Sequence, residues 1–349
     1  MSEKKRINML SSATSVDGQG VGSAYLELMG LLETYGKDDF EIQINKGLKN
    51  CDLIHVHTVE PANYFKLRSH KKPSVCYVHF LPDTLDGSIR IPKPFFRFFK
   101  RYVLKFYNSA DHLVVVNSSF KKEMIKYGLD GDKITYIPNF VSKKSFYEKS
   151  EAEKRAAREK YNFPADKFIA LGCGQVQTRK GVEDFVKVAE MLSDIQFVWA
   201  GGFSFGAVTD GYNRLKKIVD DPPANVTFTG ILPRSEMNDI FNACDLLFMP
   251  SYNELFPMTI LESASTNTPF LLRDIELYEE ILFKKYVCAG DNEGFASMIR
   301  RFADDKEFYR EQIGNAAYIS DYYSEPKIYA MWKKFYLDCI ENARAAELP

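Results

Sequence analysis

The sequence predicts an α/β protein made of two doubly wound, parallel-sheet domains that face each other across a central cleft. Short runs of β-branched and aromatic residues alternate with longer amphipathic segments along the chain, which is typical of βα units around parallel sheets. The 349 residues are about twice the usual length of one domain, so two hydrophobic cores are expected.

Each half of the chain contains six candidate strands. They are residues 6–11, 40–44, 52–57, 74–80, 112–117 and 134–138, then 167–173, 195–200, 225–229, 245–250, 269–273 and 286–289. The polar segment 142–166 indicates a linker followed by a helix. We therefore expect a first domain over 1–145 and a second over 146–326. Residues 327–349 are expected to form a helix that packs back on one of the domains, with the first as the candidate.

Charge is distributed unevenly, although the net charge of the chain is −1. Residues 1–145 contain 22 Lys and Arg against 15 Asp and Glu, a net charge of +7, and the remainder contains 24 against 32, or −8. This asymmetry predicts that only the first half faces an anionic partner. No apolar run is long enough to span a membrane, and no signal peptide is expected. The six cysteines lack the spacing of a metal or redox site, so we expect buried thiols in a protein of the reducing cytoplasm.

A basic loop in the second half is suited to phosphate. Arg179 and Lys180 stand in a glycine-bounded loop after the strand at 167–173, where ligands of parallel sheets bind. An arginine can bind phosphate oxygens in pairs, and a lysine acts as a point charge. A solvated βα loop is the alternative interpretation.

Two glutamates flank a predicted helix start. Pro257 suits the first position of a helix, which would leave the amides of 258–260 pointing outward as an anion site. Glu254 then lies in the preceding loop and Glu262 in the second helical turn, so a diphosphate with a sugar on each side would fit between them. Alternatively, Glu262 only complements the helix dipole, and Glu254 is a surface acid.

These features resemble a known family. The E-x7-E pattern of Glu254 and Glu262, with the Arg179-Lys180-Gly181 loop and Tyr136-Ile137-Pro138-Asn139, resembles the retaining family 4 glycosyltransferases of the GT-B fold. The resemblance runs from near Gly20 to about residue 325. It implies that Arg179 and Lys180 hold the donor diphosphate, that Glu254 contacts the transferred sugar, and that Glu262 contacts the ribose.

The resemblance implies further donor contacts. They are Gly20 and Gly22 at the phosphates, His79 facing the sugar, Ile231 and Leu232 at the base, and Pro257, Met258 and Thr259 at a phosphate. Gly20 and Gly22 are expected to lie in a loop that leads into a helix from about Ser23 to Leu32. Glu254, His79, Lys180 and Arg179 form the expected catalytic group, without a metal. His55 and His57 are interpreted as structural. The chain departs from the family at Gln175, where an arginine is usual, at Phe140 in the hinge, and at Asn267, which a left-handed helix cap tolerates.

Residues 92–107 predict a basic, aromatic helix. A cationic stripe beside aromatic rings suits the surface of an anionic membrane, although one face of such a helix must also pack on the sheet. The residues assigned to the membrane are Lys93, Arg97, Phe98, Phe99, Lys100, Arg101 and Lys105. Binding to nucleic acid is not expected, because no recognised module accompanies the basic residues.

Together, these features predict a retaining hexosyltransferase on the inner face of the cell membrane, attached peripherally. It would move glucose or galactose from UDP-glucose or UDP-galactose to a glycolipid such as monoglucosyl-diacylglycerol. No cofactor is expected. The acceptor is the one implied by the resemblance to bacterial diglycosyl-diacylglycerol synthases. A polyprenyl-linked or soluble glycan acceptor, and a sugar-nucleotide sensor without activity, remain alternatives. A dehydrogenase is disfavoured because the dinucleotide fingerprint is absent from both halves.

Overall fold

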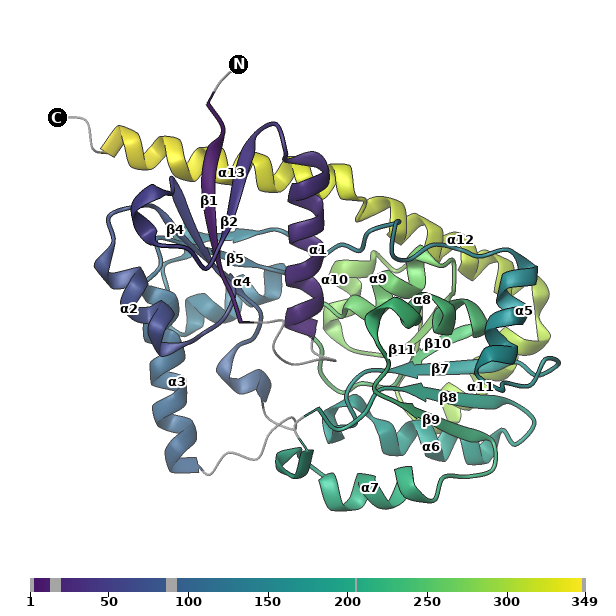
Figure 1. The fold of residues 1–349 in the computed structure, drawn as a ribbon. Coiled ribbons are helices and arrows are strands. Elements are labelled where there is room, and N and C mark those ends of the chain that lie inside the picture. The colour runs from purple at the N-terminus through teal and green to yellow at the C-terminus, as the bar shows by residue number, and fades with distance from the viewer. Residues whose placement is uncertain (1–2, 13–19, 86–92, 205, 347–349) are drawn as a thin grey trace.

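The computed structural model describes residues 3–12, 20–85, 93–204 and 206–346, and contains two six-stranded parallel sheets (Figure 1). All twelve predicted strands are confirmed. The first sheet, in the order β2-β1-β3-β4-β5-β6, comprises β1 (Lys5–Leu10), β2 (Phe40–Ile44), β3 (Leu53–Val56), β4 (Ser74–Val78), β5 (His112–Val115) and β6 (Ile134–Tyr136). The second, in the order β12-β11-β10-β7-β8-β9, comprises β7 (Ile169–Cys173), β8 (Gln196–Ala200), β9 (Val226–Gly230), β10 (Leu246–Met249), β11 (Phe270–Arg273) and β12 (Val287–Ala289).

Helices cover the sheets and confirm the α/β fold class (Figure 1). The first domain has α1 (Gly20–Tyr35), α2 (Pro61–Ser69), α3 (Lys93–Asn108) and α4 (Ser118–Lys126). The second has α5 (Glu151–Lys160), α6 (Val182–Met191), α7 (Tyr212–Asp220), α8 (Arg234–Ala243), α9 (Met258–Ser265), α10 (Glu276–Leu282), α11 (Asn292–Asp304) and α12 (Lys306–Tyr322), and α13 (Glu325–Ala346) ends the chain. Short 3-10 turns are η2 (Leu48–Asn50), η3 (Pro82–Leu85), η4 (Gly131–Lys133), η5 (Thr178–Lys180) and η6 (Gly206–Val208).

Helix α1 corrects one expectation. The sequence predicted a glycine loop leading into a helix from residue 23, whereas the helix already begins at Gly20. The residues Val21, Ala24, Tyr25 and Leu28 have the spacing of one helical face, and all except Val21 are buried. Gly20 and Gly22 therefore belong to the first helical turn, and the preceding residues 13–19 lie outside the described part of the chain.

Two local expectations can be checked directly. Asn267 has φ of +56°, which is the left-handed conformation expected where the helix α9 ends. The cysteines were all expected to be buried, but Cys288 is exposed, because it lies on β12 at the edge of the second sheet.

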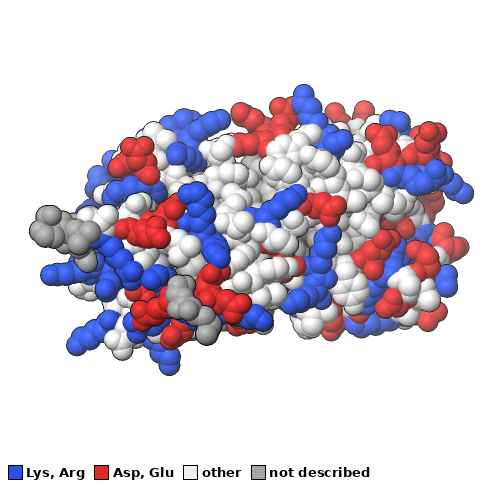
Figure 2. All heavy atoms as spheres, turned by 90° about the horizontal axis from the view of Figure 1, so that it is seen from above, with Lys and Arg blue, Asp and Glu red and all other residues white. Residues whose placement is uncertain are grey.

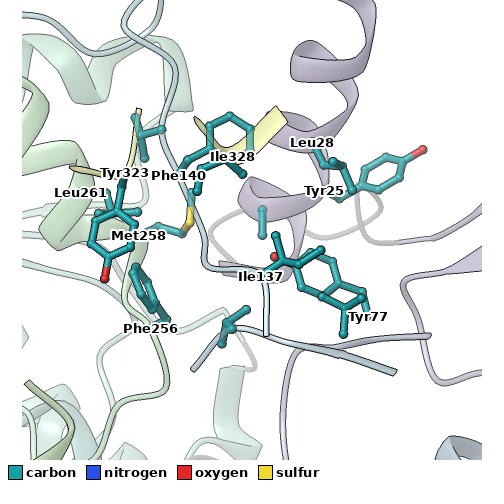
Figure 3. Packing of buried hydrophobic residues seen from close by; sticks show 14 of the residues in the cluster. Tyr25, Leu28, Tyr77, Ile137, Phe140, Phe256, Met258, Leu261, Tyr323 and Ile328 are labelled. Carbon is teal, nitrogen blue, oxygen red and sulfur yellow. The ribbon is translucent and has the colours of Figure 1, made fainter. Parts of the chain in front are cut away.

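An apolar core joins the two domains at the linker. Ile137 and Phe140 pack there between residues of α1 and residues of the second domain (Figure 3). Phe140, the hinge residue that departs from the family pattern, is buried at 4% exposure. The side chains seen together in Figure 3 are Tyr25, Leu28, Tyr77, Ile137, Phe140, Phe256, Met258, Leu261, Tyr323 and Ile328.

The last helix, α13, returns across the first domain and packs on α1 and β3 (Figure 1). Trp332 is buried between the rings of His55 and Tyr77. The Tyr336 hydroxyl lies 2.8 Å from His55 Nδ1. Aromatic residues that sequence periodicity placed on one helical face therefore complete the core of a sheet formed much earlier in the chain.

We predict that Trp332→Ala lowers the free energy of unfolding by about 3–5 kcal/mol, because it removes a fully buried ring and leaves a cavity. The adjacent Met331→Ala, in a side chain that is 36% exposed, should change it by about 0.5 kcal/mol or less. Urea denaturation followed by circular dichroism measures both. Equal effects from the two substitutions would contradict the packing assigned to α13.

Candidate active site

A buried ion pair lies where two neighbouring strands end. Lys180 closes η5 after β7, and Glu254 follows β10, which pairs with β7. The carboxyl ends of parallel strands meet at one edge of a sheet, so these loops converge. Lys180 Nζ donates to Glu254 Oε1 at 2.5 Å, and Arg179 NH1 lies 3.7 Å from Glu254 Oε2. The structure thus brings together three of the four residues expected to be catalytic.

A glycine makes this approach possible. Gly181 has φ of +71°, and a Cβ placed on it would lie 2.3 Å from the carbonyl oxygen of Pro250. Any side chain would separate the two loops, because this contact is with backbone. Gly174 lies against the stem of Lys180, where an added Cβ would be 3.5 Å from the lysine side chain. The contact at Gly174 is an ordinary one, so it is Gly181 that lets the two loops approach closely enough for Lys180 to reach Glu254.

The charges of this pair depend on one another. Burial by itself would raise the pKa of Glu254, but the positive charges of Lys180 and Arg179 outweigh it and hold that pKa below its ordinary value. Burial lowers the pKa of Lys180, and Glu254 offsets only part of this effect. A buried carboxylate is therefore kept ionised by two cations that can also bind an anionic ligand.

A second network, which sequence reasoning missed, holds the loop that carries Glu254. Arg273, at the end of β11, donates through Nε to the Pro250 carbonyl at 2.9 Å and through NH2 to Asp184 Oδ2 at 2.5 Å. Its guanidinium lies 4.0 Å from the ring centroid of Tyr252. The sequence signal that could have indicated this network is the arginine at the end of the otherwise apolar strand Phe270–Arg273.

The start of α9 differs in detail from the prediction. Pro257 is the cap residue before the helix, with ψ of 122°, and is not the first helical residue. The amide of Ile260 donates to the Pro257 carbonyl at 3.2 Å, so it does not point outward as expected. The amides of Met258 and Thr259 remain at the helix start. The Thr259 hydroxyl contacts Met249 Sδ at 3.3 Å.

Two asparagines of the first domain bind the loop between Glu254 and α9. Asn139 Nδ2 donates to the Phe256 carbonyl at 3.1 Å, and its Oδ1 accepts from the Tyr77 hydroxyl at 3.0 Å. Asn117, which caps α4, donates to the Leu255 carbonyl. Asn139 belongs to a motif that the sequence singled out, but its function as a contact between domains was not predicted.

Glu262 binds an arginine that the sequence analysis overlooked. Arg234, the first residue of α8, donates through NH1 to Glu262 Oε1 at 2.7 Å, and its NH2 pairs with Glu27 of α1 at 2.5 Å. The loop between β9 and α8 carries Ile231, which is 45% exposed, and the half-buried Leu232. Arg234 therefore follows the predicted base contacts closely in the sequence and binds the predicted ribose contact, Glu262, directly.

His79, the fourth residue expected to be catalytic, belongs to a histidine cluster at the end of the first sheet. Its ring stacks on His57 with centroids 5.8 Å apart, and His57 lies 4.1 Å from His55. Burial lowers the pKa of His55 and of His79 to about 3, and that of His57 well below its usual value. These rings are therefore neutral near pH 7.

The residues of α3 that were assigned to a membrane differ in their exposure to solvent. Arg97, Arg101 and Lys105 are exposed, and Phe98 is 72% exposed. In contrast, Phe99 stacks on Phe80, and Lys100 pairs with Asp83 at 2.7 Å and lies over the ring of Tyr127. The side chain of Lys93 lies outside the described residues.

The described residues include neither a membrane-spanning helix nor a group of metal ligands. No helix within the described ranges is long and apolar enough to cross a bilayer. In the same ranges, no three His, Cys, Asp or Glu side chains are grouped as metal ligands would be. Asp130, in the Asp130-Gly131-Asp132 turn, caps η4 by accepting from the Asp132 amide at 3.0 Å.

Two family models match the chain. Residues 38–144 match the model described as Glycosyltransferase Family 4, and residues 153–319 match the model described as Glycosyl transferases group 1. The alpha-galactosylglucosyldiacylglycerol synthase of Streptococcus pneumoniae is 43% identical over 338 residues, which are 96% of this chain and 90% of that protein. The processive diacylglycerol alpha-glucosyltransferase of Acholeplasma laidlawii is 26% identical over 93% of this chain and 95% of that protein.

Solved structures share the fold. Sucrose-phosphate synthase from Thermosynechococcus elongatus superposes with a TM-score of 0.80 at 15% identity, covering 97% of this chain and all of that one. HepE of Anabaena, in complex with UDP and glucose, superposes with a TM-score of 0.76 at 16% identity, covering 94% of this chain and 98% of that one. Both confirm the predicted two-domain architecture.

The histidine cluster predicts how stability depends on pH. Below about pH 6.5 the unfolded chain protonates these histidines, whereas His55 and His79 in the folded protein do so only at about 3. The free energy of unfolding should therefore decrease as pH falls from 7 to 5, by up to about 1.4 kcal/mol per pH unit for each buried histidine.

His57→Phe should reduce this slope by up to about 1.4 kcal/mol per pH unit. Urea titrations at pH 5, 6 and 7 measure it, and comparing slopes removes any constant loss of packing caused by the substitution. An unchanged slope would contradict the neutral, buried state of His57.

Proposed function

The chain belongs to the family 4 glycosyltransferases, and from this premise we propose that it transfers a hexose from a UDP-sugar to a glycolipid acceptor. The observation that carries the proposal is the buried contact between Lys180 and Glu254 beside Arg179, where β7 and β10 end. It joins a phosphate-binding charge to a sugar-binding carboxylate within one site.

We assign residues to each part of the UDP-sugar donor. The diphosphate replaces Glu254 as the partner of Lys180 and Arg179, because each cation can bind phosphate oxygens. The released carboxylate is then available to the hydroxyls of the transferred sugar. The first amides of α9, at Met258 and Thr259, face the same diphosphate with the positive end of the helix dipole. Ile231 and Leu232 are assigned to the base.

The proposed reaction retains the anomeric configuration and uses no metal or cofactor. The acceptor hydroxyl oxygen bonds to the anomeric carbon on the face from which UDP departs. The bond from that carbon to the diphosphate oxygen breaks, its electron pair stays on the oxygen, and the hydroxyl proton moves to the diphosphate. Lys180 and Arg179 stabilise the charge that develops on the phosphate, while Glu254 and the neutral His79 orient the sugar.

We propose galactose as the sugar and monoglucosyl-diacylglycerol as the acceptor. The support is the name of the relative with 43% identity, an alpha-galactosylglucosyldiacylglycerol synthase. The relative with 26% identity is named as a diacylglycerol glucosyltransferase, so glucose is the second candidate. A polyprenyl-linked or soluble glycan acceptor would use the same donor residues and is distinguished only by the product.

The donor assignment predicts the effect of removing each partner. Lys180→Ala should lower kcat/KM for the UDP-sugar by roughly 10²–10³-fold, the usual effect of deleting a group that stabilises transition-state charge, and Glu254→Gln should also lower turnover. Products are measured by mass spectrometry with mixed UDP-galactose and UDP-glucose and with monoglucosyl-diacylglycerol as acceptor.

Lys187→Ala and Glu190→Gln serve as matched controls, because they remove an ammonium and a carboxylate group from exposed positions of α6. They should retain wild-type turnover. Full turnover by Lys180→Ala would refute its assigned function, and no transfer of either hexose to the glycolipid by the wild-type protein would refute the proposed reaction.

We further propose that the enzyme attaches peripherally to the inner face of the cell membrane through α2 and α3. Tyr64 of α2 packs against Tyr102 and Phe106 of α3, so the two helices form one surface. Three aromatic side chains of that surface, Phe65, Phe95 and Phe98, are 68–72% exposed. The exposed cations around them are Arg68, Lys71, Lys72, Arg97, Arg101 and Lys105. Exposed rings surrounded by cations suit an anionic bilayer.

Arg97→Gln with Arg101→Gln should therefore weaken binding to vesicles containing anionic lipid by roughly tenfold or more, at about 1 kcal/mol for each lost charge. Flotation of the protein with phosphatidylglycerol vesicles measures this. Lys306→Gln with Arg310→Gln removes two exposed cations at the same spacing from α12, at the opposite end of the molecule (Figure 1). This control should float like the wild type. Equal flotation of both double variants would rule out α3 as the membrane surface.

A further inference from the structure

Arg234 lies between carboxylates from the two domains. Its guanidinium binds Glu262 of α9 at 2.7 Å and Glu27 of α1 at 2.5 Å, and it donates to the Ser23 hydroxyl at 3.1 Å. The linker contributes as well, since the ring of Phe146 lies 4.9 Å from this guanidinium. Both carboxylate side chains are only 5–6% exposed. One partly exposed cation, with a side chain that is 27% exposed, therefore contacts α1, the linker, α8 and α9.

Both buried carboxylates pair with the same arginine. Removal from water penalises an ionised carboxylate unless a cation or hydrogen-bond donors replace the solvent. Burial raises the pKa of Glu27 above its usual value, and the nearby charge of Glu262 acts in the same direction, while Arg234 opposes both effects. Separation of the domains would expose Glu27 to water or leave Arg234 with one partner. The contact therefore favours the arrangement in which the domains are together.

Three segments assigned to the donor meet at this cluster. Glu27 lies on the helix whose first residue, Gly20, is assigned to the donor phosphates, about 10 Å along the helix axis at 1.5 Å per residue. Arg234 follows the base-contacting pair Ile231 and Leu232 after one proline, and Glu262 is assigned to the ribose. The position of α1 relative to α9 therefore sets whether phosphates and ribose can be contacted at the same time.

We propose that Arg234 is a positioning residue that couples binding of the UDP moiety to closure of the cleft. By binding Glu27 and Glu262 together, it places the start of α1 over the donor phosphates and orients Glu262 toward the ribose. This inference rests on the donor site proposed above. Because coupling between sites is reciprocal, a residue of the first domain that never touches the donor must then influence affinity for UDP.

Glu27→Gln tests the coupling with little disturbance of the fold. The amide has nearly the same size, and its oxygen can still accept the Ser142 amide that now donates to Glu27 Oε2 at 2.9 Å. The NH2 group of the glutamine then faces Arg234, so the charge and the hydrogen bond opposite Arg234 are both lost. Glu33→Gln is the matched control, because it makes the same substitution on the exposed face of the same helix.

Isothermal titration with UDP should show that Glu27→Gln raises the Kd about 5-fold or more, within the usual range of coupling between sites. Glu33→Gln should leave it unchanged. In an Arg234→Met background, Glu27→Gln should have no further effect on the Kd, because its partner is already absent. The KM for the UDP-sugar should rise with that Kd while the KM for the glycolipid stays constant, which a general loss of folding would not produce.

Lys180→Ala distinguishes failure of this inference from failure of the proposed function. If Lys180→Ala binds UDP weakly while Glu27→Gln binds it like Glu33→Gln, the coupling through Arg234 is wrong and the donor site stands. If Lys180→Ala binds UDP as tightly as the wild type, the donor site itself is wrong. Additive effects of Glu27→Gln and Arg234→Met would also overturn the coupling.

Discussion

The close approach of the loops after β7 and β10 is the constraint on which the site depends. It places Lys180 against Glu254, and it is possible only because Gly181 has no side chain to meet the Pro250 carbonyl. A buried pair of charges does not by itself stabilise a fold, so neighbouring contacts must hold it. Arg273 anchors the Pro250 carbonyl from within the second domain.

The first domain completes this arrangement across the cleft. Asn139 and Asn117 hold the carbonyls that follow Glu254, and Arg234 joins Glu262 to α1. Each of these three contacts ends on the loop or helix that carries a predicted donor residue. Relative movement of the domains would therefore change the donor site directly, which is how binding of a nucleotide can be linked to the position of the acceptor side.

The uneven charge of the chain corresponds to its two domains. Acidic side chains gather at the end of the molecule formed by the second domain (Figure 2). The elements of this domain that we propose to bind the diphosphate are local: two adjacent cations and a helix start. The surplus positive charge of the first domain lies partly on α3, but not all cations of this helix face solvent. Arg97 and Arg101 face solvent, while Lys100 is held by Asp83, 17 residues earlier in the chain.

The sequence by itself determined the twelve strands, the two parallel sheets and the family, and it singled out Arg179, Lys180, Glu254 and Glu262 as candidate site residues. Each of these is encoded by neighbours in the chain: hydrophobic period, glycine position and short motif spacing. Only the tertiary structure decided that Arg234 joins Glu27, 207 residues away, and that His55 meets Tyr336, 281 residues away. The chemistry of such a pair is visible in each residue, but its formation depends on how two domains and a final helix pack.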